Sequence, residues 1–269
     1  MVRGIYTAAT GAIVAENNID MIANNLANVS TIGFKRQMMQ IESQPMADVY
    51  RWQSDPGPAV ATRGALSSTS SQAYVGQLGS GSDIYDTPTN FEQGSIELTS
   101  NELDFALYGK GFFAIRNALG IRYTRDGSFV RNPLGYLTTT NGDAVLDQQG
   151  NLIALPSQGR ISSDQAGTLS VNGAIFAKIG IYDVTNPRVV RSSGGNLLID
   201  SGSNVTPDNT TAVVQGGTEK SNADVVRSMV DLIIAQRWFD ANTKVIQTED
   251  QATGMAISAV GNTTSTAGG

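Results

Sequence analysis

The sequence predicts an α+β protein in which N- and C-terminal helices form a coiled-coil-like layer and flank an inserted, mainly antiparallel β domain. Three observations support this prediction. Apolar residues recur at helical spacing near the N-terminus and again near the C-terminus, and a series of short β-prone runs lies between these two regions. With 269 residues, 40% of them hydrophobic, the chain can bury a substantial core. We therefore expect a helical layer built from both chain ends and a separate β domain.

An apolar seam predicts the first helix. Apolar or small residues recur at alternating intervals of three and four, which is the spacing of a coiled coil. They are Ile5, Ala8, Ala12, Ala15, Ile19, Ile22, Leu26 and Val29. We expect a helix from about residue 4 to 28, with an exit at Gly33, and assign residues 1–35 to this segment.

Asparagines crowd the opposite face of this helix. At 100° per residue, five of them fall within an arc of about 120°: Asn17, Asn18, Asn24, Asn25 and Asn28. A solvated polar face is one interpretation, but such faces usually carry better helix formers such as Glu, Lys and Gln. The asparagines favour a crowded surface whose amides bond to neighbouring subunits, and hence a helix packed on both sides.

The central part of the chain predicts an extended connector followed by the β domain. Residues 36–90 form the connector, because residues 54–90 are rich in Ser, Gly, Pro and Thr. Residues 91–215 form the β domain, with turn residues such as Asp126-Gly127 and Asn141-Gly142 between its strands. The strand candidates are 112–115, 121–124, 136–138 and 144–146, with a later group at 174–184 and 196–200.

A second helical pattern occupies residues 216–260. Ser221–Asp224 resembles a capping box and places acidic charge at the positive end of the helix. Apolar residues then follow at helical spacing: Val225, Met229, Leu232, Phe239 and Ile246. Residues 261–269 are expected to form a flexible tail.

The composition argues against several classes of function. The chain has no histidine and no cysteine, so it lacks the commonest metal ligand, the usual general base near neutral pH and any thiol nucleophile. Its net charge of -6 gives no overall cationic field for nucleic acid or an anionic membrane. We expect no catalytic, cofactor or metal site and no nucleic-acid partner.

The distribution of apolar residues also bears on localisation. No apolar run approaches the roughly 20 residues of a membrane helix, and polar residues such as Glu16 and Asp20 interrupt the N-terminal region. We therefore expect no membrane insertion and no cleaved signal peptide. The absence of cysteine gives weak support for export into an oxidising compartment.

Two other classes of protein are alternatives. A β-rich hydrolase would need two carboxylates at a suitable separation, and the candidates are Glu97, Glu102, Asp104, Asp143 and Asp147. An adhesin with a helical stalk would need exposed aromatic residues, and the candidates are Tyr50, Trp52, Tyr74 and Tyr85. Acidic residues at turns and strand edges are a weak signal for catalysis. The aromatic residues could equally pack the connector against the β domain or a neighbouring subunit.

Glycine-containing loops suggest structure rather than ligand binding. The loops around Asn141–Asp143 and Asp147–Asn151 lack the ligand spacing of an EF-hand. Gly109-Lys110-Gly111 is too short for a phosphate-binding loop and is expected to shape a hairpin before the core candidates Phe112 and Phe113.

Several motifs together resemble the bacterial flagellar axial proteins, the rod subunits and the hook. The N-terminal motif is NNLANVSTIGFK at residues 24–35, preceded by YTAATG at residues 6–11. Residues 215–217, 221–226, 229–237 and 244–248 are similar to the closing helix of that family, and residues 93–94, 103–106, 109–113 and 123–129 resemble the β domain of the rod subunits that have one. The resemblance covers nearly the whole chain.

The length fits the two related rod subunits known as F (proximal rod) and G (distal rod). Distal-rod proteins commonly have tyrosine where this chain has Trp238. Their β domains also usually resemble one another after Gly150 more closely than this chain resembles them. These differences favour the F type, with the G type as the alternative.

The resemblance implies a structural subunit rather than an enzyme. It implies that the terminal helices form an inner tube and the β domain an outer layer of a rod that transmits torque. The expected partners are copies of the chain, other rod subunits, hook and ring proteins, and the type III export apparatus; the expected location is the periplasmic rod of the basal body. The assembly interface is predicted to contain Ile5, Ala12, Ile19, Ile22, Asn24, Asn25, Leu26, Asn28, Val29, Val225, Met229, Leu232, Phe239 and Ile246.

Overall fold

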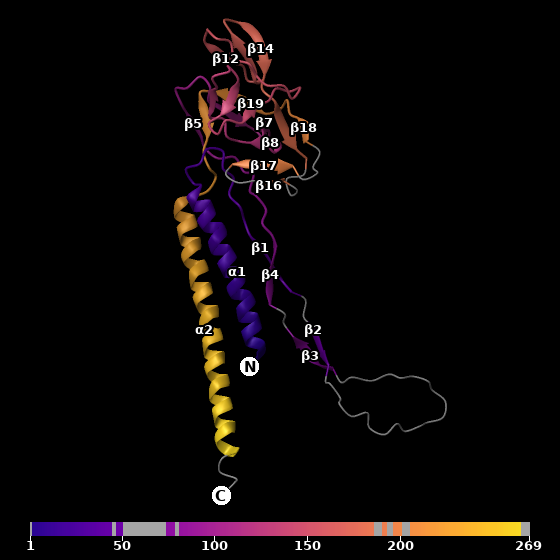
Figure 1. The fold of residues 1–269 in the computed structure, drawn as a ribbon, viewed down its shortest axis with the longest axis vertical. Helices are drawn as coiled ribbons and strands as arrows, with labels where there is room; N and C mark the ends of the chain where they lie inside the picture. The colour runs from indigo at the N-terminus through magenta and orange to yellow at the C-terminus, as the bar shows by residue number, and fades with distance from the viewer. Residues whose placement is uncertain are drawn as a thin grey trace, which may run out of the picture. The chain divides into compact units, whose positions relative to one another are not determined.

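The computed structural model describes residues 2–44, 47–50, 74–78, 81–185, 190–192, 196–200 and 205–264 (Figure 1). Helix α1 (Val2–Ala27) and helix α2 (Val225–Thr264) flank an inserted domain of antiparallel strands, so the predicted α+β architecture is confirmed. The chain divides into two compact units. The helical unit contains residues 1–18, 40–86 and 234–269, and the β unit contains residues 19–39 and 87–233.

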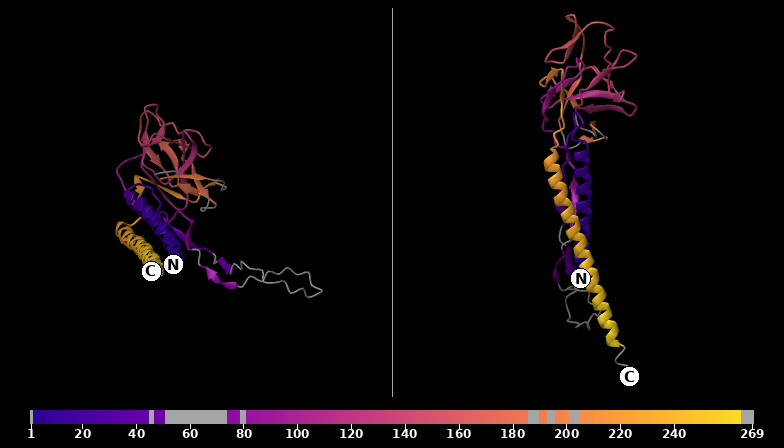
Figure 2. Two further views of the ribbon diagram at one scale, coloured as in Figure 1. Left: turned by 60° about the horizontal axis from the view of Figure 1, so that its bottom comes forward. Right: turned by 90° about the vertical axis from the view of Figure 1, so that its left-hand side faces the viewer.

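In the helical unit, α1 and α2 run antiparallel with glycines at their contact. A Cβ at Gly4 would lie 3.1 Å from Glu249 Oε1, and one at Gly11 would lie 2.9 Å from Asn242 Oδ1. The two glycines are one heptad apart, as are their two partners, so the contact repeats like a coiled-coil seam. Both views in Figure 2 show this part of the two helices side by side.

The buried side of α1 only partly follows the predicted seam. Ala8, Ala15 and Ile22 are buried as the seam predicts, but Val14, outside the seam, is buried as well. Gly81 explains this difference, because its backbone lies against Thr10, one turn before Val14. A segment of the same chain therefore covers part of α1 on the side that the seam leaves open.

That segment belongs to the predicted connector, which forms two antiparallel ribbons. Strand β1 (Gln40–Ser43) pairs with β4 (Ser82–Asp86), and β2 (Ala47–Tyr50) pairs with β3 (Tyr74–Leu78). Residues 51–73, within the segment expected to be most extended, lie outside the described residues. The predicted domain boundaries stay a prediction.

Among the described residues, the largest sheet of the β unit has nine strands. Its order is β16-β17-β8-β7-β11-β10-β9, and β15 pairs with both β7 and β18. The bounds are β7 (Phe112–Asn117), β8 (Gly120–Thr124), β9 (Phe129–Arg131), β10 (Leu137–Thr139), β11 (Ala144–Val145), β15 (Ile181–Val184), β16 (Val190–Ser192), β17 (Leu197–Asp200) and β18 (Val205–Pro207). The strands predicted from the sequence therefore occur, with ends that differ by one or two residues.

Smaller sheets complete the β unit and connect its two ends. Strands β12 (Ile161–Ser163), β13 (Thr168–Val171) and β14 (Ala174–Lys178) form one sheet. Strand β5 (Ile96–Leu98) pairs with β20 (Gly217–Glu219), and β6 (Phe105–Tyr108) pairs with β19 (Ala212–Gln215). The first strands of the unit thus pair with its last strands, so the unit closes only when residues 212–219 are in place.

The core of the β unit lies between these sheets. Its fully buried large side chains include Phe105, Phe113, Phe129, Leu137 and Ile179. Phe113 and Phe129 pack edge to face, with ring centroids 5.1 Å apart. This core fixes the strands that present the polar residues described below.

Helix α2 differs from its predicted bounds at both ends. It begins at Val225 and continues to Thr264, so residues 261–264, expected in the tail, are helical. At the first turn, Asp224 Oδ1 accepts a hydrogen bond from the Arg227 amide at 2.8 Å, which makes Asp224 the N-cap. The predicted acidic charge is present, but the cap lies three residues beyond the start of the predicted capping box.

Candidate functional site: helix faces and a buried charge cluster

Within the β unit, the segment after α1 packs against other chain segments at a residue that must be glycine. Gly33 has a φ of 69°, and a Cβ there would lie 2.4 Å from the backbone carbon of Arg125. Its amide donates to the carbonyl of Glu219 at 2.7 Å. The close approach of three chain segments therefore depends on the missing side chain of Gly33.

Two residues later, three charged side chains meet in the interior. Lys35 Nζ lies 2.6 Å from Glu219 Oε1, and Arg125 Nη1 lies 2.9 Å from Glu219 Oε2. The side chains of Lys35, Arg125 and Glu219 are 3%, 2% and 0% exposed. We call these three residues the charge cluster.

Backbone groups satisfy much of the remaining hydrogen-bonding capacity of the charge cluster. Lys35 Nζ donates to the carbonyl of Glu92 at 2.7 Å, and Arg125 Nη2 donates to the carbonyl of Gly109 at 2.6 Å. The amide of Gly94 donates to Glu219 Oε1 at 2.8 Å. Charge-assisted hydrogen bonds of this length are among the stronger ones in proteins.

Burial dominates the electrostatics of the two cations. It lowers the pKa of Lys35, and the hydrogen bond and charge of Glu219 oppose that change. Burial likewise lowers the pKa of Arg125, opposed by the charges of Glu219, Asp183 and Asp208. The Arg125 guanidinium also stands 5.0 Å from the centroid of the Phe112 ring. Removing Glu219 would leave two buried cations without their shared anion.

Two asparagines surround the charge cluster with further contacts. Asn222 Nδ2 donates to the carbonyls of Asn90 and Glu92, and its Oδ1 accepts from the amide of Arg36. Asn196 Nδ2 donates to the carbonyl of Ile32 and to Asp126. These bonds hold Asn222 outside α2 and account for the later start of the helix.

The predicted interface residues of α1 differ widely in exposure. Ile22 and Asn25 are buried, Asn24 is exposed, and the others are half-buried: Ile5, Ala12, Ile19, Leu26, Asn28 and Val29. In α2, Leu232, Phe239 and Ile246 are half-buried, whereas Val225 and Met229 are exposed. Their role between subunits stays a prediction.

The asparagine face of α1 makes contacts within the chain. Asn25 Nδ2 donates to the carbonyl of Gln37 at 2.8 Å, and its Oδ1 accepts from the Gln37 amide at 2.9 Å. Asn17 and Asn28 donate to carbonyls of their own helix. Asn25 lies roughly 60° around the helix from Ile22, at the edge of the seam, which brings it against the returning chain. Its burial needs no neighbouring subunit, contrary to the expectation from sequence.

Helix α2 carries an apolar surface that the sequence analysis missed. Val226, Val230 and Ile233 are 72%, 50% and 51% exposed. They lie roughly opposite the stripe of Ala235 and Asn242, and we call them the outer α2 face. Their spacing of four and three residues was the signal in the sequence that could have identified this surface.

Four of the five carboxylates considered for hydrolysis have structural partners. Glu97 pairs with Lys220 at 2.7 Å and Glu102 with Arg160 at 2.8 Å, and all four side chains are solvent-accessible. Asp104 accepts hydrogen bonds from Thr99 and Asn101. Asp147 Oδ1 accepts from the amides of Gln149 and Asn151, which is turn chemistry, as expected for this loop.

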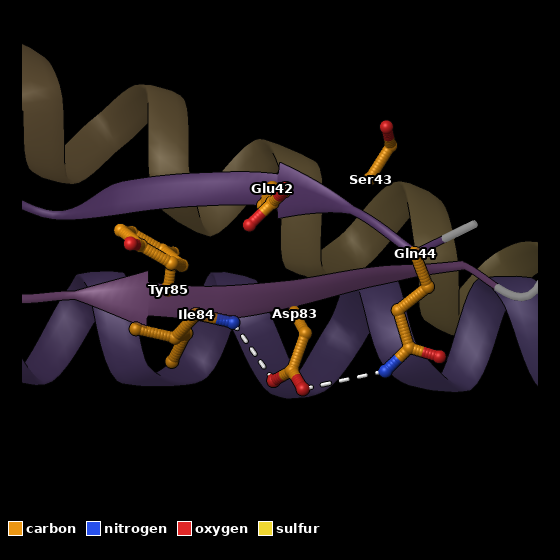
Figure 3. A pocket seen from close by; sticks show the side chains of 6 residues that line it. All are labelled: Glu42, Ser43, Gln44, Asp83, Ile84 and Tyr85. Carbon is orange, nitrogen blue, oxygen red and sulfur yellow. Dashed lines mark hydrogen bonds between the residues drawn. The ribbon is translucent and has the colours of Figure 1, made fainter.

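Of the aromatics considered for an adhesin, Tyr85 is exposed on the β1–β4 ribbon, while Tyr50, Trp52 and Tyr74 lie outside the residues whose side chains are described. A pocket of about 270 Å³ beside Tyr85 is lined by Glu42, Ser43, Gln44, Asp83 and Ile84, and Figure 3 shows these side chains. Asp83 accepts bonds from its own ribbon, namely the Ile84 amide and Gln44 Nε2. The pocket carboxylate therefore stabilises the ribbon. Neither described helix contains a stretch apolar enough to cross a membrane.

The fold and these surfaces define a class of protein: a structural subunit with paired terminal helices, an inserted β domain and an uncovered apolar helix face. Three family models match the chain: a flagella basal body rod protein model at residues 5–35, a flagellar hook protein FlgE/F/G D1 domain at residues 106–177, and a flagellar basal body rod FlgEFG protein C-terminal model at residues 214–259.

Curated relatives match over nearly their full lengths. FlgG of Borreliella burgdorferi is 33% identical, with 95% of this chain and 98% of the relative covered. FlgF of Caulobacter vibrioides is 28% identical, with 97% and 99% covered. FlhP of Bacillus subtilis, a flagellar hook-basal body complex protein, is 30% identical, with 95% and 98% covered. The chain belongs to the flagellar basal-body rod protein family of the F/G type.

Proposed function

We propose that this protein is a structural, non-enzymatic subunit of the flagellar basal-body rod and polymerises through its terminal helices. The observation that supports this proposal is the outer α2 face, three apolar side chains exposed on the surface of a long helix. A second copy of the chain would bury them, as helices with apolar faces require.

The helices offer two different surfaces for such contacts. On α1, Tyr6 and Ile13 are exposed and point away from the glycine-lined side that meets α2. Contact between the outer α2 face of one copy and this surface of the next would be heterologous. Heterologous contacts extend into rings or open helical polymers rather than closed dimers, which suits a rod.

The rest of the proposal follows the family resemblance. The helices form the inner tube, the β unit forms the outer layer, and the rod passes torque from motor to hook. Other rod subunits, hook and ring proteins are its neighbours, and the chain reaches the periplasm unfolded through the type III export apparatus. Trp238 favours the proximal position, with the distal position as the alternative; gold labelling of the chain in isolated basal bodies would distinguish the two.

Substitution on the outer α2 face tests the polymerisation proposal. Ile233→Asp should leave the β unit folded, because Ile233 is half exposed in the single chain, yet abolish incorporation, because a carboxylate would be buried without a partner. Gln247→Asp lies two heptads further along the same side of α2, where Asp240 and Lys244 already make the surface polar; it is the matched control and should incorporate normally. The measurement is the amount of chain in basal bodies isolated from cells with no other copy of the gene. Normal incorporation of Ile233→Asp would refute the proposed interface.

A further inference from the structure

We propose that the charge cluster is a mechanical joint that locks the ends of both helices onto the β unit and carries torque between them. This inference rests on the proposed rod function and assigns one part of it to Lys35, Arg125 and Glu219. The end of α1 (residues 19–27) and the beginning of α2 (residues 225–233) both belong to the β unit, so the joint lies within one compact body.

The charge cluster joins segments that are distant in the sequence. Glu219 comes from β20, just before α2, and Lys35 comes from the segment just after α1. Arg125 follows β8 of the main sheet, and the carbonyls of Glu92 and Gly109 come from two further loops. One carboxylate thus connects both helix ends to the central sheet.

Backbone hydrogen bonds follow the same path and are expected to share the load. Residues 219–222 lie between two other segments of the chain. On one side, the amide of Gly33 donates to the carbonyl of Glu219, and the amide of Asn222 donates to the carbonyl of Phe34; on the other side, the amide of Lys220 donates to the carbonyl of Ser95. A displacement of either helix end would strain these bonds and the ionic contacts together. The ionic contacts resist it strongly because the three side chains are shielded from water and salt.

An exposed ion pair beside the charge cluster provides a matched control. Glu97 and Lys220 form a bond of similar length between β5 and the residue after β20, but both side chains are more than half exposed. Such surface pairs contribute little to stability. Glu97→Gln therefore changes the same strand pair and the same chemical group without touching the joint.

Hydrogen exchange of the purified full-length chain tests whether the joint is local. We expect Glu219→Gln to speed amide exchange roughly tenfold or more at residues 33–36 and 216–222, because the two cations lose their shared anion. Strands β7 and β10 should keep their protection, and Glu97→Gln should match the wild type. Unchanged exchange in Glu219→Gln, or an equal rise throughout β7 and β10, would overturn the proposal. If Glu219→Gln does not fold, Lys35→Met, which retains the Arg125–Glu219 pair, should give the same local pattern to a smaller degree.

Cells carrying each full-length variant test whether the joint carries load. Glu219→Gln should be incorporated into basal bodies, yet swimming speed should fall at least twofold relative to Glu97→Gln as medium viscosity is raised. An incorporated Glu219→Gln chain with wild-type swimming at every viscosity would overturn the joint while leaving the rod proposal intact. If the Glu219→Gln chain were absent from basal bodies, the joint proposal would also be overturned, because the charge cluster would then be required for assembly. Absence of the wild-type chain from basal bodies would instead refute the rod function itself.

Discussion

At the scale of single residues, the motif NNLANVSTIGFK divides into two functions. Its asparagines stay with α1, where Asn25 bonds Gln37 and Asn28 bonds its own helix. Its last residues leave the helix and pack inside the β unit, where Gly33 and Lys35 meet Glu219. The sequence predicted an exit from the helix at Gly33, but the buried role of Lys35 depends on a partner 184 residues away, which no local pattern reveals.

Gly33→Ala should be strongly destabilising. Alanine would have to adopt a positive φ and place its Cβ 2.4 Å from backbone that cannot move aside easily. We expect a loss of about 3 kcal/mol or more in the free energy of unfolding, measured by urea denaturation followed by circular dichroism. Gly142→Ala is the control, since Gly142 also has a positive φ but has no atom within 4 Å of the added Cβ. That variant should lose only about 1 kcal/mol; equal losses would show that the contact with Arg125 is unimportant.

Asp208 gives the stability of the β unit a dependence on acid pH. Burial raises the pKa of Asp208, but hydrogen bonds from Thr211 and Thr210 outweigh it and hold that pKa below the usual 3.8. A carboxyl group whose pKa is lowered by folding stabilises the folded state above its unfolded pKa, and this contribution is lost as pH falls through the folded pKa.

Thr210→Val should therefore be costly near neutral pH and harmless in acid. The variant removes the bond from Thr210 Oγ1 to Asp208 Oδ1, 2.7 Å long, and should lose about 1 kcal/mol of unfolding free energy at pH 6. The gap from the wild type should shrink as pH falls below 3.8. Thr140→Val, at an exposed position, controls for the methyl group. A gap that stays constant down to about pH 2 would contradict the role of Asp208.

At the scale of elements, local pairings were predictable and distant ones were not. Strands β7 and β8 form a hairpin whose β-prone runs and turn residues are adjacent in the sequence, so pattern alone found them. Pairing of β5 with β20 spans the whole β unit, and pairing of β1 with β4 spans the connector. Such contacts arise from packing of the complete chain, so the late start of α2 at Val225 and the joint between the helix ends could not be predicted from spacing.

Gln215 joins two sheets with a side chain in place of a strand. Its Nε2 donates to the carbonyls of Ile161 and Glu102 at 2.9 and 2.8 Å, and its Oε1 accepts from the Ser163 amide at 2.9 Å. The amide thus occupies the edge of β12 as a neighbouring strand would, and protects it from pairing with another chain.

Gln215→Leu should release β12 while leaving the main sheet intact. Three backbone groups would lose their partner, at a cost of about 1–3 kcal/mol, and amide exchange should rise at residues 161–163 but not in β7. Gln149→Leu, on an exposed loop, makes the same chemical change elsewhere and should alter neither. Wild-type exchange in β12 of the Gln215→Leu chain would show that the β13 pairing alone holds this edge.

At the scale of the whole molecule, the described residues leave apolar side chains exposed on both helices, and we propose that further copies of the chain cover them. The sequence analysis expected a helix packed on both sides and assigned the second side to the asparagines of α1. In the structure, the chain beside the β1–β4 ribbon covers part of α1, and the large apolar residues that the two helices expose include the outer α2 face and Tyr6 and Ile13 of α1. The two surfaces lie on different helices, so the proposed contact between copies pairs unlike surfaces.

Pairing of unlike surfaces makes a prediction that a symmetric dimer does not share. The natural chain has no cysteine, so cysteines can be placed singly at Ile13 and Val230, both of which are exposed. A chain with both Ile13→Cys and Val230→Cys should give a ladder of multiples with a flexible bismaleimide under assembly conditions, whereas each single variant should stay monomeric. An isologous interface would place equivalent residues of two copies together and give dimers from Val230→Cys alone. The ladder should weaken when Ile233→Asp is added, because the carboxylate prevents burial of the outer α2 face, and should persist with Gln247→Asp.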